Sequence, residues 1–385
     1  IGVRLVGSEM CIRDRYLMHI PWGWIKQRPH FFAEYLASDN IIDVYYRKSN
    51  TVSQNKLLTS EQVGIPNMSI KGFNNIPFKK IPLFKNFSLD WINAIIAYIQ
   101  LPSVKKYDYV WITSPIIYSF LRYSLSGKKI IYDCMDDMIE FPDIKNHPLL
   151  EKEILNNEKE LLMKADIVFV SSDYLKNKVQ ERANLRVRNI HTINNAVELP
   201  SLNKKEKLPQ DVADKVAFIR NLSFPFMYVG MISEWFDFFL IKKTVEKFPQ
   251  INIVLLGPCD TDIVKHERIH YLGIVERRYI FDLMKEAYSL IMPFQLNELI
   301  YSVNPVKLYE YIYTGKPVIS VEYGETKKFA NFVSLYNRNE DFFELVAGIL
   351  NAPEKYAKNK ELIDLYIREN TWQARYNQIL KFLGL

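Results

Sequence analysis

Cysteine is scarce in this sequence, and its three copies form no motif. Cys11, Cys134 and Cys259 lie far apart among 385 residues, and no CxxC pair occurs. This argues against a disulfide framework or a cysteine zinc site and suits a reducing compartment. Long apolar runs are missing too, because no window holds 18 consecutive apolar residues, and the N-terminus lacks the order of a signal peptide. We expect a cytoplasmic protein with free thiols.

Common nucleotide and metal motifs are also missing. The sequence contains neither GxGxxG nor GxxxxGK[ST], which argues against a dehydrogenase or a P-loop enzyme. Its six histidines are scattered without metal-ligand spacing. The triplet Asp260-Thr261-Asp262 follows an expected strand without supporting ligands, so we interpret it as a loop. We expect no metal and no cofactor.

The charge balance lacks a strong excess of either sign. Fifty Lys and Arg residues stand against 44 Asp and Glu residues, a net charge of +6. This is too mild for a dedicated nucleic-acid binder, but it is compatible with anionic small molecules or an acidic membrane surface. With 48% hydrophobic residues and 45.5 kDa, the chain has the composition of a globular protein of two domains.

Short apolar runs alternate with longer amphipathic stretches from Tyr16 onward, which is typical of parallel sheets covered by helices. We therefore predict an α/β protein of two Rossmann-like, doubly wound domains that face each other across a cleft. Ligands of such sheets bind beyond the carboxyl ends of the strands. The expected parts are a first domain at 16–200, a linker at 201–222, a second domain at 223–363 and a helix at 364–385 that closes back toward the first domain.

Residues 1–15 differ in character from the rest of the chain. The stretch 6–15 resembles a translated adaptor tail of the kind found in metagenomic gene predictions. We treat 1–15 as a non-native leader and exclude it from function. The alternative is an ordinary N-terminal strand.

The most informative stretch spans residues 301–320, where a loop, a proline, a short helix and a glycine stop precede an apolar strand. The amino end of that helix offers amide groups and the positive end of the helix dipole to a diphosphate. Lys307 adds a full charge, and Glu310 lies one turn later on the same face, where a carboxylate suits sugar hydroxyls. The alternative is an ordinary surface pair of Lys307 and Glu310.

This stretch resembles the donor-binding segment of GT-B-fold nucleotide-sugar glycosyltransferases of the group 1, family 4 type. In that family two glutamates eight positions apart bracket the segment, and the second holds the donor ribose. Glu310 matches the second glutamate, whereas Ser302 stands in place of the first. The sequence departs from the family pattern at this position, and we expect Ser302, Asn304 and backbone amides to contact the sugar or phosphate instead.

Two further segments resemble the same family. Residues 227–232 match its first C-terminal strand and glycine turn, where Gly230 lets the backbone approach the diphosphate. Residues 233–237 lack the basic residue that many relatives have there, so Lys307 would carry more of the phosphate neutralisation. Residues 270–275, with Gly273, resemble the segment that pairs with the nucleobase. A plain strand and turn is the alternative for this last segment.

Residues 22–30 follow the first expected strand and resemble a WxxxxQRPH-type signature of a branch that includes teichuronic-acid and capsule-type transferases. Trp22 and Trp24 offer flat faces for a sugar ring, while Gln27 and Arg28 offer hydrogen-bond donors for hydroxyls or an anion. We expect these four residues to bind the acceptor. Alternatively, the tryptophans cap the core and Arg28 pairs with a carboxylate.

Three carboxylates crowd five positions at the end of another apolar strand: Asp133, Asp136 and Asp137. Like charges this close raise at least one pKa, which suits a general base for an acceptor hydroxyl. Asp136 and Asp137 lie near the place where GT-B relatives hold a catalytic residue, so we predict them as catalytic. The alternative is that each caps the following helix.

Residues 78–87, followed by Trp91, Ile95, Ile96 and Ile99, mix cations with bulky apolar groups, a composition typical of membrane interfaces. On this interpretation the protein docks on the inner leaflet of the membrane to reach a lipid-linked acceptor. The alternative is a loop that leads into a buried helix.

Together these features predict sugar transfer from a nucleotide-diphosphate donor to a carbohydrate or lipid-linked acceptor in surface polysaccharide synthesis. An inverting reaction would use Asp136 or Asp137 as base, whereas a retaining one would leave the proton to the departing phosphate. A nucleotide-sugar 2-epimerase and a non-catalytic sugar-binding homologue are the alternatives.

Overall fold

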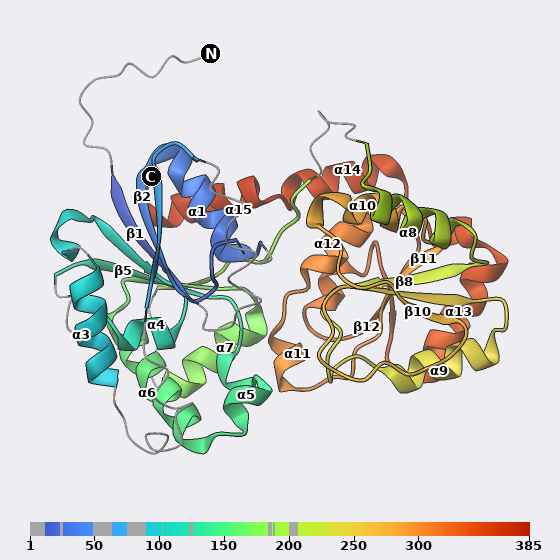
Figure 1. Ribbon diagram of the computed structural model, residues 1–385, viewed down its shortest axis with the longest axis horizontal. Helices are drawn as coiled ribbons and strands as arrows, with labels where there is room; N and C mark the ends of the chain where they lie inside the picture. The colour runs from blue at the N-terminus through green and yellow to red at the C-terminus, as the bar shows by residue number, and fades with distance from the viewer. Residues whose placement is uncertain are drawn as a thin grey trace, which may run out of the picture. The chain divides into compact units, whose positions relative to one another are not determined.

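The computed structural model divides the chain into two compact units (Figure 1). It describes residues 12–23, 26–48, 64–74, 90–101, 103–122, 125, 127–183, 187, 189–199 and 207–385. The first unit comprises Ile1–Ile193 with Gln378–Leu385, and the second comprises Asn194–Asn377. Each unit alternates parallel strands with helices, so the predicted α/β class with two Rossmann-like domains is confirmed.

In its described residues the first unit has a seven-stranded sheet of order β3-β2-β1-β4-β5-β6-β7, and all neighbouring strands run parallel. The order reverses between β1 and β4, at the switch point where such sheets bind ligands. Strand β6 is buried along its whole length, because helices cover both faces of a parallel sheet. The strands are β1 (Arg13–Met18), β2 (Ile41–Arg47), β3 (Met68–Phe73), β4 (Tyr109–Ile112), β5 (Lys129–Cys134), β6 (Ile167–Val170) and β7 (Ile190–Thr192).

One face of this sheet packs against four helices through a single buried cluster. The cluster contains strand residues such as Val110 and at least one buried residue from each of the four helices. These are Ala97 of α3, Tyr118 of α4, Leu161 of α6 and Val179 of α7. The helices of the first unit are α1 (Arg28–Asp39), α3 (Asp90–Gln100), α4 (Pro115–Ser119), α5 (Pro142–Lys145), α6 (Pro148–Lys164) and α7 (Asp173–Ala183), with 3-10 turns η2 (Val104–Lys106) and η3 (Met138–Glu140).

A row of aromatic rings from the strands lines the other face. Tyr16 stacks on Trp111, and Trp111 stacks on Phe169, with ring centroids 5.7 and 6.1 Å apart. Phe382, near the end of α15 (Trp372–Leu383), continues the row and stacks on His191 at 3.7 Å. The chain thus returns after the second unit to cover the sheet of the first, which confirms the predicted closing helix.

In the second unit six strands form a parallel sheet of order β10-β9-β8-β11-β12-β13. One large buried cluster of side chains from strands and helices forms its core. The strands are β8 (Pro225–Val229), β9 (Asn252–Leu256), β10 (Ile269–Tyr271), β11 (Ser289–Met292), β12 (Val318–Val321) and β13 (Ser334–Tyr336). The helices are α8 (Gln210–Arg220), α9 (Phe238–Lys247), α10 (Ile280–Met284), α11 (Glu298–Ser302), α12 (Val306–Tyr313), α13 (Asn339–Asn351), α14 (Lys360–Glu369) and α15, with 3-10 turns η4 (Arg277–Tyr279), η5 (Thr326–Phe329) and η6 (Pro353–Lys355).

The boundaries differ from the predicted ones in three places. The expected linker at 201–222 contains α8, whose Val212, Val216 and Ile219 belong to the core of the second unit; residues 200–206 lie outside the described ones. The expected single closing helix is two helices, α14 and α15, separated near Thr371, which pairs with Val197. Of the expected leader, residues 13–15 form the start of the central strand β1, because their backbone pairs with β2 and β4. Residues 1–11 lie outside the described ones.

None of the helices in the described part of the chain combines the length and the apolar character that crossing a bilayer requires.

Candidate functional site

In the second unit, the short helix α12 is fastened to the end of strand β8. Its side chains Leu308, Tyr311 and Ile312 are buried, while Gly315, with φ of +73°, allows the left-handed turn that ends the helix. The hydroxyl of Tyr311 accepts a hydrogen bond from the amide of Val229 at 2.8 Å and lies 3.3 Å from the carbonyl oxygen of Val229. The helix therefore has a fixed position beside the carboxyl end of β8.

Three glycines bring backbones close together at this edge of the sheet. The amide of Gly230 donates to Leu256 at the end of β9, and the amide of Gly257 donates to the carbonyl of Gly273, both at 2.9 Å. A Cβ atom at Gly257, whose φ is +134°, would lie 2.0 Å from the carbonyl oxygen of Gly230. Gly257 thus lies between Gly230 and Gly273 at this edge. The sequence reasoning missed Gly257, although it follows an apolar strand as Gly230 does.

Four charged side chains of alternating sign form a connected row near the first turn of α12. Lys307 Nζ lies 2.9 Å from Glu310 Oε2, and Arg277 Nη2 lies 2.9 Å from Glu310 Oε1. Arg277 Nε in turn lies 3.1 Å from Glu198 Oε2. Burial alone would raise the pKa of Glu310, but Lys307 and Arg277 outweigh it and hold the pKa below its ordinary value. Glu310 is therefore an ionised, buried carboxylate.

Arg277 is the residue of this row that sequence reasoning missed. It opens the 3-10 turn η4, two positions after the segment 270–275 that was expected to contact the nucleobase. Burial alone would lower the pKa of its guanidinium, but the carboxylates of Glu310 and Glu198 outweigh burial and raise the pKa above its ordinary value. The signal in the sequence was the Arg277-Arg278 pair beside that segment.

Ser302 and Asn304 lie in the interior of the second unit. The Ser302 hydroxyl donates to the carbonyl of Leu299 at 2.7 Å within α11. Asn304 Oδ1 accepts from the amide of Asn195, and its Nδ2 donates to Glu325 Oε2 at 2.8 Å. Both side chains are buried, so this arrangement argues against the expected donor contacts and assigns them to positioning the loop before α12.

In the first unit, Arg28 is buried against the first of the three aspartates. Its Nη2 and Nε atoms lie 2.8 and 2.9 Å from Asp133 Oδ1, and Nη1 donates to the carbonyl of Ile193. Neither Arg28 nor Asp133 is accessible to solvent. The expected acceptor contact of Arg28 therefore needs correction, because a guanidinium already bound to a buried carboxylate is not free to bind a sugar.

The two predicted catalytic aspartates lie in the loop after β5 and have different surroundings. Asp137 is buried and forms an ion pair with Arg182 of α7. The side chain of Asp136 is partly exposed. Burial raises its pKa to about 6; the positive charge of Arg28 lowers the pKa, and the negative charges of Asp137 and Asp133 raise it further. Burial is thus the main cause of the raised pKa, and the predicted crowding of carboxylates adds to it. Of the two, Asp136 has the properties of a general base, whereas Asp137 holds the loop.

Ser171, the residue that follows strand β6, anchors the same loop. Its hydroxyl donates to the carbonyl of Met135 at 2.6 Å, and its amide donates to the carbonyl of Cys134 at 3.1 Å. The backbone directly before Asp136 is thereby fixed, a condition for a group that must meet its substrate at a set distance.

The turn after β1 only partly matches the expected acceptor platform. Trp22 is buried with its ring 5.1 Å from that of His30, so it packs into the core as the alternative held. Gln27 precedes α1 and is partly exposed, while Trp24 lies outside the described residues. His19, which the sequence reasoning passed over, lies at this edge with Nδ1 2.8 Å from Thr113 Oγ1, and burial lowers its pKa to about 4.

Among the described residues, no group of three or more His, Cys, Asp or Glu side chains is arranged to hold a metal ion. Asp260 and Asp262 lie in a loop after β9.

Comparison with known proteins gives a consistent result. No protein-family model matches the chain. The chain is 25% identical, over 292 residues that cover 72% of each protein, to Bacillus subtilis TuaH, whose name assigns it to teichuronic acid biosynthesis as a glycosyltransferase. Anabaena HepE, solved in complex with UDP and glucose, superposes with a TM-score of 0.69 over 97% of this chain and 99% of that one, at 15% identity. The chain has the GT-B fold.

Two further GT-B structures extend the likeness. Sucrose-phosphate synthase from Thermosynechococcus elongatus matches with a TM-score of 0.70 over 97% of this chain and 98% of that one, at 12% identity. An Escherichia coli structure of the trehalose-6-phosphate system, bound with UDP-2-fluoro glucose, matches with a TM-score of 0.67 over 96% and 98%, at 14% identity. Together with the match to TuaH, this likeness confirms the predicted resemblance to GT-B nucleotide-sugar glycosyltransferases and gives the epimerase alternative no support.

Proposed function

We propose that this GT-B protein transfers a sugar from a nucleoside diphosphate sugar to a carbohydrate acceptor in surface polysaccharide synthesis. The observation that carries the proposal is the pair Lys307 and Glu310 at the first turn of α12, which Tyr311 ties to the end of β8. A cation, the amides of a first helical turn and the positive end of the helix dipole all favour a diphosphate at this place. An ionised carboxylate one turn later suits sugar hydroxyls.

Uridine diphosphate sugars are the first donors to test. The HepE structure contains UDP and glucose, and the E. coli structure contains UDP-2-fluoro glucose. The name of TuaH, which assigns it to teichuronic acid biosynthesis, supports a surface polysaccharide as the product. Free thiols at Cys134 and Cys259 suit the reducing cytoplasm, which is where we place the reaction.

The reaction breaks the bond between the anomeric carbon and the diphosphate, and an acceptor oxygen takes its place. Lys307 and the first turn of α12 stabilise the charge that develops on the departing diphosphate. Asp136 accepts the proton of the acceptor hydroxyl in an inverting reaction. In a retaining reaction the departing phosphate accepts it instead, and the anomeric configuration of the product decides between the two.

The donor assignment is tested by Lys307→Ala with Lys285→Ala as its matched control. Lys285 also pairs with a carboxylate three residues away, Asp282 at 3.1 Å, but next to α10. Loss of one charge-assisted contact should weaken binding of UDP by about tenfold or more in calorimetric titration, while the control binds as wild type does. Unchanged affinity in Lys307→Ala would remove Lys307 from the donor site.

A non-catalytic sugar-binding homologue is the second candidate. It is favoured by one observation: Ser302, in place of the family's first glutamate, is buried and bonded to Leu299. Tight binding of nucleoside diphosphate sugars without transfer to any of a panel of glycan and polyprenyl-linked acceptors would support it. Release of UDP that depends on an acceptor would refute it.

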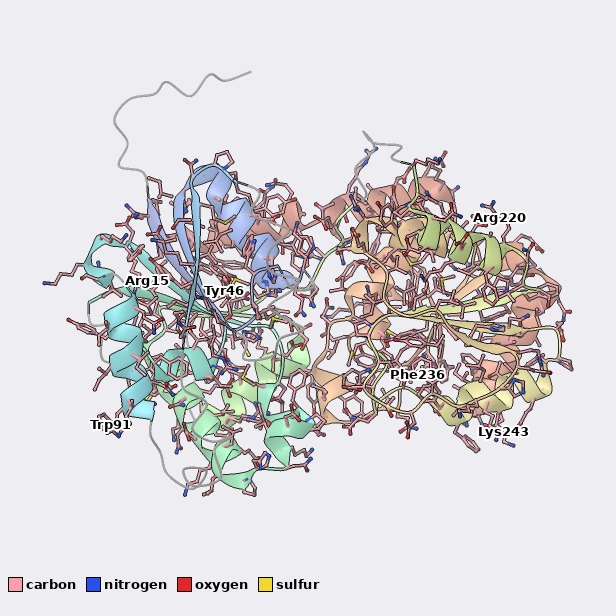
Figure 2. All side chains as sticks on the ribbon, in the orientation of Figure 1. Arg15, Tyr46, Trp91, Arg220, Phe236 and Lys243 are labelled. Carbon is pink, nitrogen blue, oxygen red and sulfur yellow. The ribbon has the colours of Figure 1, made fainter. Side chains whose placement is uncertain are left out.

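We also propose that the acceptor is lipid-linked and that the protein docks on the inner leaflet through α3. Four large apolar side chains of this helix share one face and are exposed: Trp91 57%, Ile95 51%, Tyr98 72% and Ile99 77%. Figure 2 shows Trp91 projecting from the outer side of the ribbon. An exposed aromatic and aliphatic face of this kind suits the interfacial region of a bilayer. Residues 78–87, which precede it, lie outside the described residues.

The docking proposal is tested with vesicles of phosphatidylglycerol and phosphatidylcholine. The variant Trp91→Ala/Ile99→Ala should lose most of its cosedimentation with the anionic vesicles. Leu362→Ala/Leu365→Ala is the control, because both leucines are 58% exposed on α14. Equal binding by both variants, or no binding by the wild type, would contradict docking through α3.

A further inference from the structure

Arg47, the last residue of β2, is a cation without a counterion. Its side chain is partly exposed, and within the described part of the chain it makes no hydrogen bond and no ion pair. Burial lowers the pKa of the guanidinium, and no carboxylate among the described residues opposes this effect. Arg28 and Arg182, by contrast, are each paired with an aspartate. A partly desolvated charge that nothing balances favours the binding of an anion.

His19, one residue beyond β1, lies beside Arg47. Strands β1 and β2 run parallel with Leu17 opposite Tyr45, so the same register places His19 opposite Arg47 two residues later. All four side chains fall on one face of the sheet, because alternate residues of a strand point the same way. The positive charge of Arg47 also lowers the pKa of His19, after the larger effect of burial. The two side chains therefore form one cluster at the ends of these strands.

Thr113, directly after β4, fixes the orientation of the His19 ring. Its Oγ1 accepts a hydrogen bond from the backbone amide of His19 at 3.2 Å and lies 2.8 Å from His19 Nδ1. Because the hydroxyl already accepts from that amide, its own hydrogen goes to Nδ1, and we assign the imidazole hydrogen to Nε2. With a pKa of about 4, the ring is uncharged near neutral pH. His19 thus offers an N–H donor beside the Arg47 guanidinium.

The cluster of Arg47 and His19 lies at the carboxyl edge of the first sheet, next to the switch point between β1 and β4. The strand order at this edge is β2-β1-β4-β5, and Asp136 follows β5. Neighbouring strands lie about 4.8 Å apart, so the ends of β1 and β5 are about 10 Å apart. A sugar with an attached anionic group spans a distance of this order. The cluster can therefore hold one end of a molecule whose other end meets Asp136.

We propose that Arg47 and His19 bind an anionic group of the acceptor. The guanidinium supplies a full charge and paired donors, and Nε2 of His19 supplies one further donor. The inference rests on the proposed function, because it takes the ligand to be the molecule that receives the sugar. Two groups have this chemistry, the phosphate of a lipid linker and the carboxylate of an acidic sugar. Either of them would place the accepting hydroxyl without taking part in the transfer itself.

The first experiment follows the side-chain signals of the histidines by proton–nitrogen NMR, with His19→Gln identifying the His19 signal. It compares glucose 1-phosphate and glucuronic acid with glucose, which carries no charge. At least one of the two anions should shift the His19 signal and bind about 10- to 100-fold more tightly than glucose, since a charge-assisted contact is worth that factor. Tighter binding of glucose 1-phosphate indicates a linker phosphate, and tighter binding of glucuronic acid indicates a sugar carboxylate.

Variants of Arg47 then separate a binding role from a structural one. Arg47→Gln should lower the affinity for the preferred anion by about 10- to 100-fold and leave glucose binding unchanged. Its melting temperature should equal or exceed that of the wild type, because no ion pair is lost. Arg47→Lys keeps the charge without the fork and should retain part of the affinity. Lys48→Gln is the matched control, because it removes an exposed charge from the next residue and should bind as the wild type does.

The second experiment measures sugar transfer to an uncharged glycoside and to its anionic counterpart. Arg47→Gln should raise KM for the anionic acceptor by about 10- to 100-fold, while kcat and the KM for the donor stay near the wild-type values. The KM for the uncharged glycoside should not change.

Each outcome has a definite meaning. If neither anion shifts the His19 signal, or if Arg47→Gln binds the anions as the wild type does, the anion site is refuted whether or not the protein transfers sugar. If both acceptors lose affinity equally in Arg47→Gln, the proposed function stands and the role of Arg47 is refuted. If an anion binds through Arg47 but no acceptor receives sugar, the proposed function fails, and the assignment of the anion to an acceptor fails with it.

Discussion

The pKa of Asp136 gives a quantitative test of the proposed chemistry. Burial raises this pKa from 3.8 to about 6, and a general base must be ionised before it can accept a proton. Asp136 should therefore be about one-tenth ionised at pH 5, half at pH 6 and nine-tenths at pH 7. The value of kcat/KM should rise about tenfold per pH unit below pH 6 and level off above it. An aspartate with an ordinary pKa would give a flat profile above pH 5.

The assay is release of UDP from a UDP-sugar in the presence of an acceptor, measured between pH 4.5 and pH 8. Asp136→Asn should lower kcat by about 10²- to 10⁴-fold and remove the inflection near pH 6. Asp143→Asn is the control, because Asp143 is an exposed carboxylate on the nearby helix α5 and should leave the profile unchanged.

Carbon-13 NMR of the aspartate carboxyl groups provides an independent reading without substrate. A resonance that titrates near pH 6 in the wild type should be missing in Asp136→Asn. If no carboxyl titrates there, or if Asp136→Asn keeps full activity and the same profile, the assignment of Asp136 as base is wrong.

Three further predictions concern stability and the glycine contact. Burial raises the pKa of Asp14 to about 7, above its value of 3.8 in the unfolded chain, so the free energy of unfolding should fall by about 4 kcal/mol as the pH rises from 4 to 8. Asp14→Asn should abolish most of this fall in urea titrations, and an equal fall in both proteins would contradict it. Gly257→Ala should cost about 1–3 kcal/mol in thermal unfolding and weaken UDP binding, since its Cβ would overlap the backbone of Gly230; a wild-type melting temperature would refute that contact. Arg28→Met should lower the free energy of unfolding by about 3–5 kcal/mol, because it leaves the Asp133 carboxylate without its partner in the core. The double variant Arg28→Met/Asp133→Leu should recover most of this loss, a result that a simple packing defect would not give.

The sequence predicted the elements whose signals are local. The alternation of short apolar runs with amphipathic stretches predicted the parallel sheets, because a parallel strand buried on both faces, such as β6 or β8, is apolar throughout. Strand β3 lacks this signal because it is an edge strand in which most residues are only partly buried. Helix α8 was taken for a linker because charges and Pro209 precede it, while its buried face holds only three side chains.

In the candidate site, too, the sequence predicted the contact within one helix but not the contacts between distant segments. Lys307 and Glu310 were predicted to share a face because a helix brings residues three apart together, and the structure confirms that contact. Their role in donor binding stays a prediction. Arg277 reaches Glu310 from another element, and Arg28 reaches Asp133 across 105 positions of sequence. Such pairs are set by the order of strands in the sheet, and a single sequence contains no local signal for them.

Helix α15 has a consequence for how the protein is made. It starts in the second unit and ends with Phe382 on the rings of His191 and Phe169 in the first. During translation the first unit leaves the ribosome early, yet the rings of Phe169 and His191 stay uncovered until α15 emerges. A fragment that stops at residue 193 should therefore expose an aromatic surface and aggregate, and supplying residues 371–385 as a separate peptide should restore its solubility.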